Sequence, residues 1–475
     1  MRSRRKFVQN VGMLTLAAHL DPFSLLAGTR IDFVSNRPAL KDRKFTSTAV
    51  NEAIEVFKKG VSNKEIGWLF ENCFPNTLDT TVDFEMIDGK PDTYVITGDI
   101  DAMWLRDSCA QVWPYLPMMR NDPHLKSLIE GVIRRQTTFI HLDPYANAFY
   151  KDPSKVSEWK ESDLTEMKPG VHERKWEIDS LCYPIRLAFG YWKETGDIGP
   201  FDNKWKEGIV LTLKTFKEQQ RKTDQGPYKF QRRTAWATDG VPLGGYGYPT
   251  KPVGLINSMF RPSDDATIFP FLIPSNYFAL VSLEQAAEMV SKISGDNALA
   301  AECIALSKEI KFALDQFARV MHPQIGEVFA YEVNGFGSFN LMDDANVPSL
   351  LSLPYLGVLK NDDETYKNTR KLLLSGFNPF YFKGKAGEGI GGPHAGMDMI
   401  WPLSITMRGL TSRDDFEIKK CIELLVNCHA GTGFMHESFH KDDASNFTRK
   451  WFAWANTIFG EFLWKVYREK PELFQ

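Results

Sequence analysis

The feature that most constrains the fold is a helical apolar periodicity that recurs along most of the chain. Apolar residues spaced three and four apart are typical of helices with one buried face. Strand-like alternation is confined to residues 80–98, where Asp88-Gly89 is a turn signal that predicts a small β-hairpin. The fold class is therefore predicted to be all-α with one hairpin. The twelve predicted helices span residues 47–71, 107–119, 122–141, 177–196, 203–221, 275–293, 296–317, 345–358, 362–375, 397–411, 413–429 and 449–468.

The connections between these helices alternate in length. Short links such as "MRNDPH" and "SGDNA" separate long segments rich in glycine, proline and aromatic residues. Short links pair neighbouring helices, so the chain reads as six helical hairpins. Six hairpins closed into a ring form an (α/α)6 toroid, in which inner helices line a central funnel. A merged or split helix would instead favour a plain bundle or a solenoid.

The N-terminus is basic and then briefly apolar. Residues 1–30 open with "MRSRRKF" and a short apolar run, which resembles a twin-arginine export signal. The run is too short to span a bilayer, and no later stretch approaches 18 apolar residues. We expect export to a periplasm, no membrane span, and a single domain over residues 31–475. The alternative is a basic tail that leads into an ordinary helix.

Charge and cysteine usage exclude several classes of function. The chain has 57 basic and 60 acidic residues without a long run of either sign, which argues against a nucleic-acid partner. Its six cysteines form no C-x-x-C pair and are too sparse for a disulfide framework, so buried thiols are expected.

The stretch "HESFH", His436 to His440, matches the H-E-x-x-H order of zinc peptidases. Such a site needs both histidines on one face of a continuous helix and a third ligand, for which Glu461 has a suitable spacing. Two glycines precede the motif and a turn signal follows it, which leaves little room for a helix. A zinc metallopeptidase is therefore the weaker alternative.

Acidic side chains gather before most of the predicted inner helices, together with arginine, histidine and aromatic residues. Any one such acid is commonly an N-cap. Several at the mouth of one funnel suit a polyhydroxylated ligand, because aromatic faces stack on sugar rings while carboxylates bind hydroxyls. The sequence thus favours a carbohydrate site.

Glycoside hydrolysis needs two carboxyl groups, one as acid and one as base or nucleophile. Glu437 is one candidate, and Asp264 and Asp265 in "RPSDDA" offer the other. Mutual repulsion and an aromatic surrounding could keep one of the two aspartates protonated. Alternatively, one aspartate caps the next helix and the other pairs with Arg261.

Four segments, "DIDAMWLRDS", "FRPSDDA", "GGPHAGMDMIWP" and "GFMHESF", together resemble glycoside hydrolase family 125, the exo-α-1,6-mannosidases. The resemblance runs from about residue 45 to the C-terminus. It implies an (α/α)6 catalytic domain that removes terminal α-1,6-linked mannose with inversion and without metal or other cofactor. It also implies Asp264 as general acid and Glu437 as general base.

Other residues of these segments are expected to bind the mannose-containing glycan. The candidates are Asp101, Trp104, Arg106, Asp107, Glu177, Asp179, Trp236, Arg261, Asp265, His394, Asp398, Trp401 and His436. Two alternatives are a non-catalytic glycan-binding protein, which would not need two opposed carboxylates, and a polysaccharide lyase, which would want a tyrosine or histidine base in a basic groove.

Overall fold

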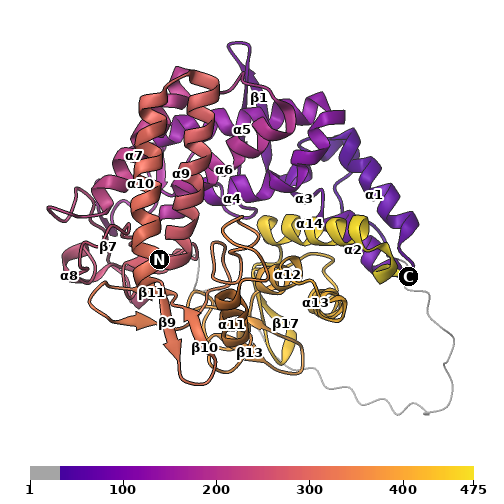
Figure 1. The fold of residues 1–475 in the computed structure, drawn as a ribbon. Coiled ribbons are helices and arrows are strands. Elements are labelled where there is room, and N and C mark those ends of the chain that lie inside the picture. Colours follow the sequence, from indigo (N-terminus) through magenta and orange to yellow (C-terminus); the bar gives the residue numbers. More distant parts are fainter. Residues whose placement is uncertain (1–32) are drawn as a thin grey trace, which may run out of the picture. The chain divides into compact units, whose positions relative to one another are not determined.

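Helices make up most of the regular structure in residues 33–475, the part of the chain that the computed structural model describes (Figure 1). The export-like segment, residues 1–30, lies outside these residues. Ser35–Gln475 form one compact unit. Within the described part, no helix is long and apolar enough to cross a bilayer.

The α-helices are α1 (Thr48–Gly60), α2 (Lys64–Cys73), α3 (Asn76–Thr80), α4 (Leu105–Val112), α5 (Pro123–Leu142), α6 (Ile178–Thr195), α7 (Asn203–Gln219), α8 (Pro242–Gly245), α9 (Ile273–Ser294), α10 (Asn297–Phe317), α11 (Glu364–Leu373), α12 (Pro402–Leu410), α13 (Asp415–Cys428) and α14 (Ala453–Glu469). Short 3₁₀ helices occupy Leu40–Asp42, Trp113–Asn121, Ala237–Asp239 and Pro471–Phe474.

The strands are short and form several small sheets. Two-stranded sheets join β1 (Val82–Ile87) to β2 (Lys90–Val95), β5 (Asp163–Leu164) to β7 (Gln231–Arg232), β9 (Arg319–His322) to β10 (Gly326–Phe329), and β13 (Tyr381–Lys383) to β14 (Glu388–Ile390). Three-stranded sheets have the orders β3 (Met103–Trp104), β4 (Ala148–Phe149), β6 (Val171–Glu173); β12 (Phe339–Asn340), β11 (Glu332–Val333), β8 (Phe271–Leu272); and β15 (Met399–Ile400), β16 (Ser438–His440), β17 (Asp443–Thr448). All pairings are antiparallel.

The predicted hairpin is confirmed, because β1 and β2 pair around the turn at Asp88 and Gly89. Most predicted helices also exist, with ends shifted by a few residues. The predicted helix 47–71 is divided into α1 and α2, because Asn63 caps α2 by accepting hydrogen bonds from the N–H groups of Glu65 and Ile66. The six cysteines are buried free thiols, as expected.

The predicted helix at 345–358 is wrong. This segment forms turns, and Asp343 accepts hydrogen bonds from the N–H groups of Leu350 at 2.8 Å and Leu351 at 3.0 Å. Pro348 and Pro354 have no N–H to donate to a helix. The apolar spacing there reflects burial of a turn rather than one face of a helix.

A chain of packed helices organises the core: α9 packs on α6, α6 on α4, α4 on α14, and α14 on α12. A second helix lies against several of them, as α10 does against α9 and α13 against α12 (Figure 1). Each helix of this inner set directly follows strands of a three-stranded sheet: β3 precedes α4, β6 precedes α6, β8 precedes α9, β15 precedes α12, and β17 precedes α14. The sheets therefore place side chains at the N-termini of the inner helices.

Candidate active site

Acidic and basic side chains meet where these inner helices begin. Arg106 and Asp107 stand in the first turn of α4, directly after β3, and Glu177 precedes α6. A tight loop, residues 260–266, brings in Asp264; the loop is closed by a β-bridge between Phe260 and Ala266. The site is thus assembled from segments that are distant in sequence.

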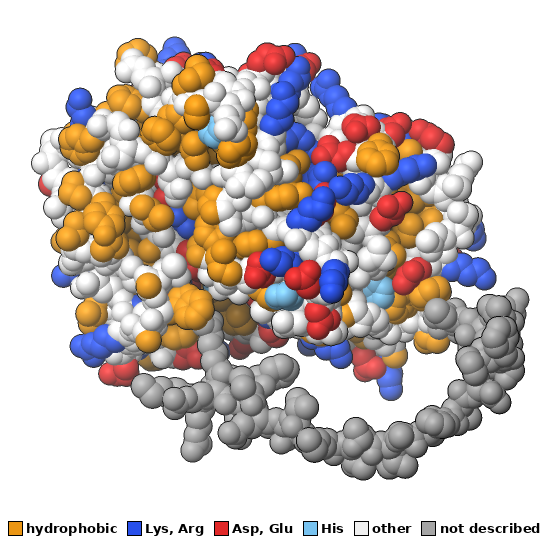
Figure 2. Space-filling model, turned by 90° about the horizontal axis from the view of Figure 1, so that it is seen from below, with side chains coloured by type: hydrophobic (Ala, Val, Ile, Leu, Met, Phe, Trp, Pro, Cys, Tyr) orange, Lys and Arg blue, Asp and Glu red, His pale blue; other side chains and the backbone are white. Residues whose placement is uncertain are grey.

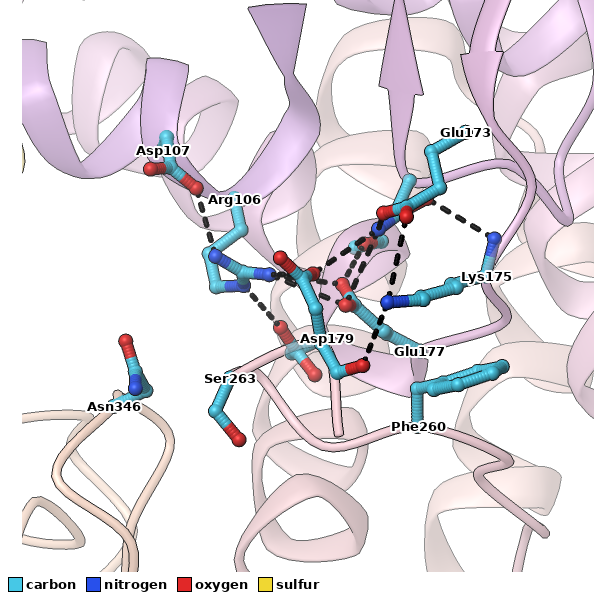
Figure 3. Close-up of polar contacts among 12 residues, drawn as sticks. Arg106, Asp107, Glu173, Lys175, Glu177, Asp179, Phe260, Ser263 and Asn346 are labelled. Carbon is cyan, nitrogen blue, oxygen red and sulfur yellow. Dashed lines mark hydrogen bonds and ion pairs between the residues drawn. The ribbon is translucent and has the colours of Figure 1, made fainter. Parts of the chain in front are cut away.

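Arg106 is the centre of the cluster (Figure 3). Its Nη1 lies 2.7 Å from Asp107 Oδ2, its Nη2 3.2 Å from Glu177 Oε1 and 3.1 Å from Asp264 Oδ1, and its Nε 3.3 Å from Asp179 Oδ2. One buried guanidinium therefore contacts four carboxylates at once. Such an arrangement fixes the direction of each carboxyl group.

Burial controls the protonation of this cluster. Desolvation raises the pKa of Asp107 to about 6 and that of Asp179 to about 7, although Arg106 opposes both shifts. Burial also raises the pKa of Glu177 well above its usual range, again against the charge of Arg106. The cluster therefore contains carboxyl groups that can donate as well as accept hydrogen bonds near neutral pH.

Asp264 is the most exposed of the four carboxylates, with 23% of its side chain accessible. Its Oδ1 accepts hydrogen bonds from Arg106 at 3.1 Å and from the Asn147 side chain at 3.2 Å. Its backbone has φ 67°, a left-handed conformation that non-glycine residues rarely adopt and that clusters at functional sites. Asp264 is therefore both firmly held and open to a ligand.

Glu437 immediately precedes β16, and 12% of its side chain is accessible. Arg449 Nη1 lies 3.4 Å from Glu437 Oε1, and Arg449 Nε donates a hydrogen bond to Asp99 Oδ1 at 2.9 Å. The charges of Glu437 and Asp264 both contribute to the raised pKa of His394, which reaches about 9 despite burial because Asp265 lies beside it. The charges of Glu437 and Asp264 thus both raise the pKa of one imidazole, although the two residues come from separate loops.

The zinc-peptidase interpretation of "HESFH" is wrong. The motif runs into strand β16 rather than along a helix, so it lacks the helical turn that would place both histidines on one face. His436 is fully buried and stacks on Phe447 with ring centroids 3.7 Å apart. Glu461 lies in α14 and accepts a hydrogen bond from Tyr355 Oη at 2.9 Å. In this structure His436 is therefore packed in the interior, against Phe447.

The structure also corrects the expected partners of Arg261 and Asp265. Arg261 Nε lies 2.7 Å from Glu332 Oε1, so it does not pair with either aspartate of "RPSDDA" through its side chain. Asp265 is 1% exposed and faces His394, whose Nδ1 lies 3.6 Å from Asp265 Oδ1. Asp265 does not cap α9, which begins at Ile273.

The remaining predicted sugar contacts differ in exposure. Trp104 and Trp401 are buried, and the rings of Trp401 and His394 pack in a T-shaped pair with centroids 6.0 Å apart. Trp236 is 48% exposed in the loop after β7. Asp101 and Asp398 are engaged by lysines: Asp101 lies 3.1 Å from Lys155, and Asp398 lies 2.7 Å from Lys441.

Several residues of the cluster were not singled out from the sequence: Asn147, Glu173, Lys175 and Arg449. Glu173 and Lys175 stand in the acid-rich segment "HERKWEIDS", so that segment carried a usable signal. Asn147 lies in an ordinary loop before β4, and nothing in its surroundings marks it.

The face seen in Figure 2, on the side of β9, β10 and β13 in Figure 1, mixes acidic, basic and hydrophobic side chains. No single sign of charge dominates the described part of this face. A helical domain with carboxyl groups gathered at the N-termini of its inner helices is typical of helical glycoside hydrolases, which act through paired carboxyl groups. Fold and site thus define this class.

The comparisons with known proteins identify the family. The sequence model of the metal-independent alpha-mannosidases (GH125) matches residues 63–464. The chain belongs to this family, glycoside hydrolase family 125, as its motifs predicted. It is accordingly an α-mannosidase.

Two relatives are similar over nearly their whole length. A solved structure from Streptococcus pneumoniae, described as a metal-independent alpha mannosidase in a non-productive substrate complex with alpha-1,6-mannobiose, is 38% identical with a TM-score of 0.85, covering 90% of this chain and 100% of that one. The meiotically up-regulated gene 157 protein of Schizosaccharomyces pombe is 42% identical over 458 residues, 92% of this chain and 89% of that protein. A bacterial glucoamylase complexed with acarbose shares the fold alone, with 13% identity, a TM-score of 0.54, and coverage of 90% of this chain and 58% of that one.

Proposed function

We propose that this α-mannosidase removes terminal α-1,6-linked mannose from the ends of glycans by a single displacement that inverts the anomeric centre. The linkage is supported by the alpha-1,6-mannobiose bound to the Streptococcus pneumoniae relative. The mechanism is supported by one observation above all: Asp264 and Glu437 come from different loops, yet the charges of both raise the pKa of the same imidazole, His394, which lies 3.6 Å from Asp265, the neighbour of Asp264.

In this mechanism Asp264 is the general acid and Glu437 the general base. Asp264 protonates the glycosidic oxygen as the bond to the anomeric carbon breaks, while Glu437 takes a proton from the water that attacks the opposite face. An inverting pair lies about 6.5–9.5 Å apart to make room for that water. Arg449 holds Glu437 from one side, and Arg106 with Asn147 holds Asp264.

The buried cluster around Arg106 would bind the terminal sugar. Asp107, Glu177 and Asp179 combine raised pKa values with fixed directions, so they can accept from or donate to hydroxyl groups of one ring. Trp401 would form part of the wall, because its ring packs against that of His394.

We also propose that the helices are arranged as an (α/α)6 toroid. The inner helices α9, α6, α4, α14 and α12 form a continuous series of neighbours, five of the six expected in an (α/α)6 toroid. The turns at 345–358 occupy the place in the chain where the sixth was expected, and Tyr183 of α6 donates to the carbonyl of Val347 at 2.7 Å.

Two variants test the assignment of acid and base. Asp264→Asn and Glu437→Gln should each lower turnover of α-1,6-mannobiose by about 10² to 10⁴ while the unfolding temperature changes little. Asp265→Asn is the matched control for the neighbouring aspartate. An inactive Asp265→Asn together with an active Asp264→Asn would reverse the assignment of the acid.

Two further measurements test the stereochemistry and the linkage. Proton NMR of the first product from an α-mannoside should show β-mannose before mutarotation, and initial α-mannose would refute inversion. Equal turnover of α-1,2-, α-1,3- and α-1,6-linked mannobiose would refute the proposed linkage.

A further inference from the structure

Lys175 is a buried ammonium group behind the Asp264 loop. It lies two residues after β6, is 2% exposed, and donates a hydrogen bond to the backbone carbonyl of Asp264 at 2.8 Å. Its Nζ also lies 3.0 Å from Asp239 Oδ1 and 3.3 Å from Glu173 Oε1. Figure 3 shows its side chain reaching toward the loop that carries Ser263. The ammonium group of Lys175 thus binds other segments of the protein, among them the loop that carries Asp264.

The segment it holds has an unfavourable backbone conformation. Asp264 stands at φ 67°, which is costly for a residue with a side chain and persists only when surrounding contacts impose it. The carboxylate is held by Arg106 and Asn147, and the carbonyl by Lys175. Both ends of the residue are therefore fixed.

Lys175 also acts on the carboxylate indirectly. Its backbone N–H donates to Asn147 Oδ1 at 3.1 Å, and this leaves the Asn147 amide nitrogen directed at Asp264 Oδ1, 3.2 Å away. The same residue thus orients the donor to the carboxylate and binds the carbonyl. A small shift at Lys175 would move both contacts together.

The ion pair between Lys175 and Asp239 connects the lysine to an exposed loop. Asp239 follows Trp236, which is 48% exposed, and the carbonyl of Thr238 accepts a hydrogen bond from Ala266 N at 2.8 Å. The segment 236–239 is therefore tied to the Asp264 loop by a side chain and by the backbone.

We propose that Lys175 is a positioning residue for the general acid: it fixes the backbone of Asp264 so that the carboxyl group meets the leaving oxygen. This inference rests on the acid role proposed for Asp264. Misplacing an acid slows only reactions whose leaving group must be protonated. A sugar alkoxide requires that proton, whereas 2,4-dinitrophenolate leaves as a stable anion.

The experiment compares two substrates in the full-length enzyme, α-1,6-mannobiose and 2,4-dinitrophenyl α-mannoside. Lys175→Met should lower kcat on mannobiose by about 10- to 100-fold and on the activated mannoside by less than about 3-fold. Lys175→Arg, which keeps the charge and a donor, should recover most of the kcat on mannobiose that Lys175→Met loses.

Arg174→Met is the matched control. Arg174 is the neighbouring buried cation, and its side chain donates to Asp143 Oδ2 at 2.7 Å and to Thr165 Oγ1 at 2.9 Å rather than to Asp264. Any effect of this variant should be equal on the two substrates, because it perturbs packing without touching the acid. An equal loss on both substrates in Lys175→Met would overturn the proposal and indicate a structural role.

Asp264→Asn in the same panel separates the two proposals. If it shows the leaving-group-dependent loss and Lys175→Met does not, the positioning role fails while the acid assignment stands. If Asp264→Asn lacks that dependence, both fail. If Lys175→Met does not fold, Asp239→Asn serves instead, because it weakens the ion pair that Lys175 makes with the exposed loop. A loss of kcat of about 3-fold on mannobiose alone supports the proposal. An unchanged ratio of kcat on mannobiose to kcat on the activated mannoside overturns it.

Discussion

Replacing Arg106 by methionine would test how the site is held together, because the change removes a guanidinium that contacts four carboxylates. Methionine fills much of the same space, so the main loss is charge and hydrogen bonding. Breaking a buried ion pair by removing one partner typically costs about 3–5 kcal/mol, since a charge is left without compensation. We expect a loss of this size in the free energy of unfolding at pH 8.

The loss should depend on pH in a defined direction. In the wild type, burial has already raised the pKa of Asp179 to about 7 and that of Asp107 to about 6, so the folded protein holds protons that the unfolded chain has released above about pH 4. Stability from these groups therefore falls as pH rises through that window. Without Arg106, the buried carboxylates must bind further protons for the protein to fold. Each such proton lowers the free energy of unfolding by up to about 1.4 kcal/mol for every pH unit of increase.

The destabilisation by Arg106→Met should accordingly shrink by about 2 kcal/mol between pH 8 and pH 6. Urea unfolding followed by tryptophan fluorescence at both pH values measures it. Arg37→Met is the control, because Arg37 is a buried partner of Asp79 at 2.7 Å but Arg43 remains 3.7 Å from the same carboxylate. Its effect should not vary between the two pH values. A loss below about 1 kcal/mol at pH 8, or one independent of pH, would refute the reasoning.

Three further predictions concern pH, metal and export. The pKa of His394, raised from 6.5 to about 9, adds stability that is complete below pH 6.5 and is lost as pH rises through 9; the urea midpoint should therefore fall between pH 7 and pH 10, and less so in Asp265→Asn. A fall of equal size in that variant would contradict the pairing. Turnover should survive EDTA, whereas inactivation reversed by zinc would point to a metal-activated water. Exchanging Arg4 and Arg5 for lysine should retain the precursor in the cytoplasm of a bacterial host, and unchanged export would refute the twin-arginine interpretation.

The sequence by itself determined the features that depend on local pattern. The helices α5, α6, α7, α9 and α10 begin and end within a few residues of their predicted bounds, because amphipathic spacing and capping act over one or two turns. The β1–β2 hairpin followed from the Asp88-Gly89 turn in the same way. The family followed from four motifs in order, since each is a contiguous stretch.

Where side-chain hydrogen bonds and ion pairs compete with the local pattern, the sequence prediction fails. At 345–358 the spacing was helical, but Asp343 takes the N–H groups of Leu350 and Leu351 and prolines remove two donors, so turns form instead. Arg261 pairs with Glu332, far along the chain, rather than with its near neighbour Asp265. Proximity in sequence was therefore a poor guide to the partner of Arg261.

Only the tertiary structure decided the composition of the site. Asn147, Lys175 and Asp264 come from three segments, and their contacts exist because β3, β4 and β6 bring the N-termini of α4 and α6 beside the 260–266 loop. A buried charge is stable only beside a partner, and that partner can come from any part of the chain that packing brings within about 4 Å. The spacing of residues along the sequence does not determine that distance. The motifs therefore indicated the chemistry, whereas the neighbours of each site residue depend on the tertiary structure.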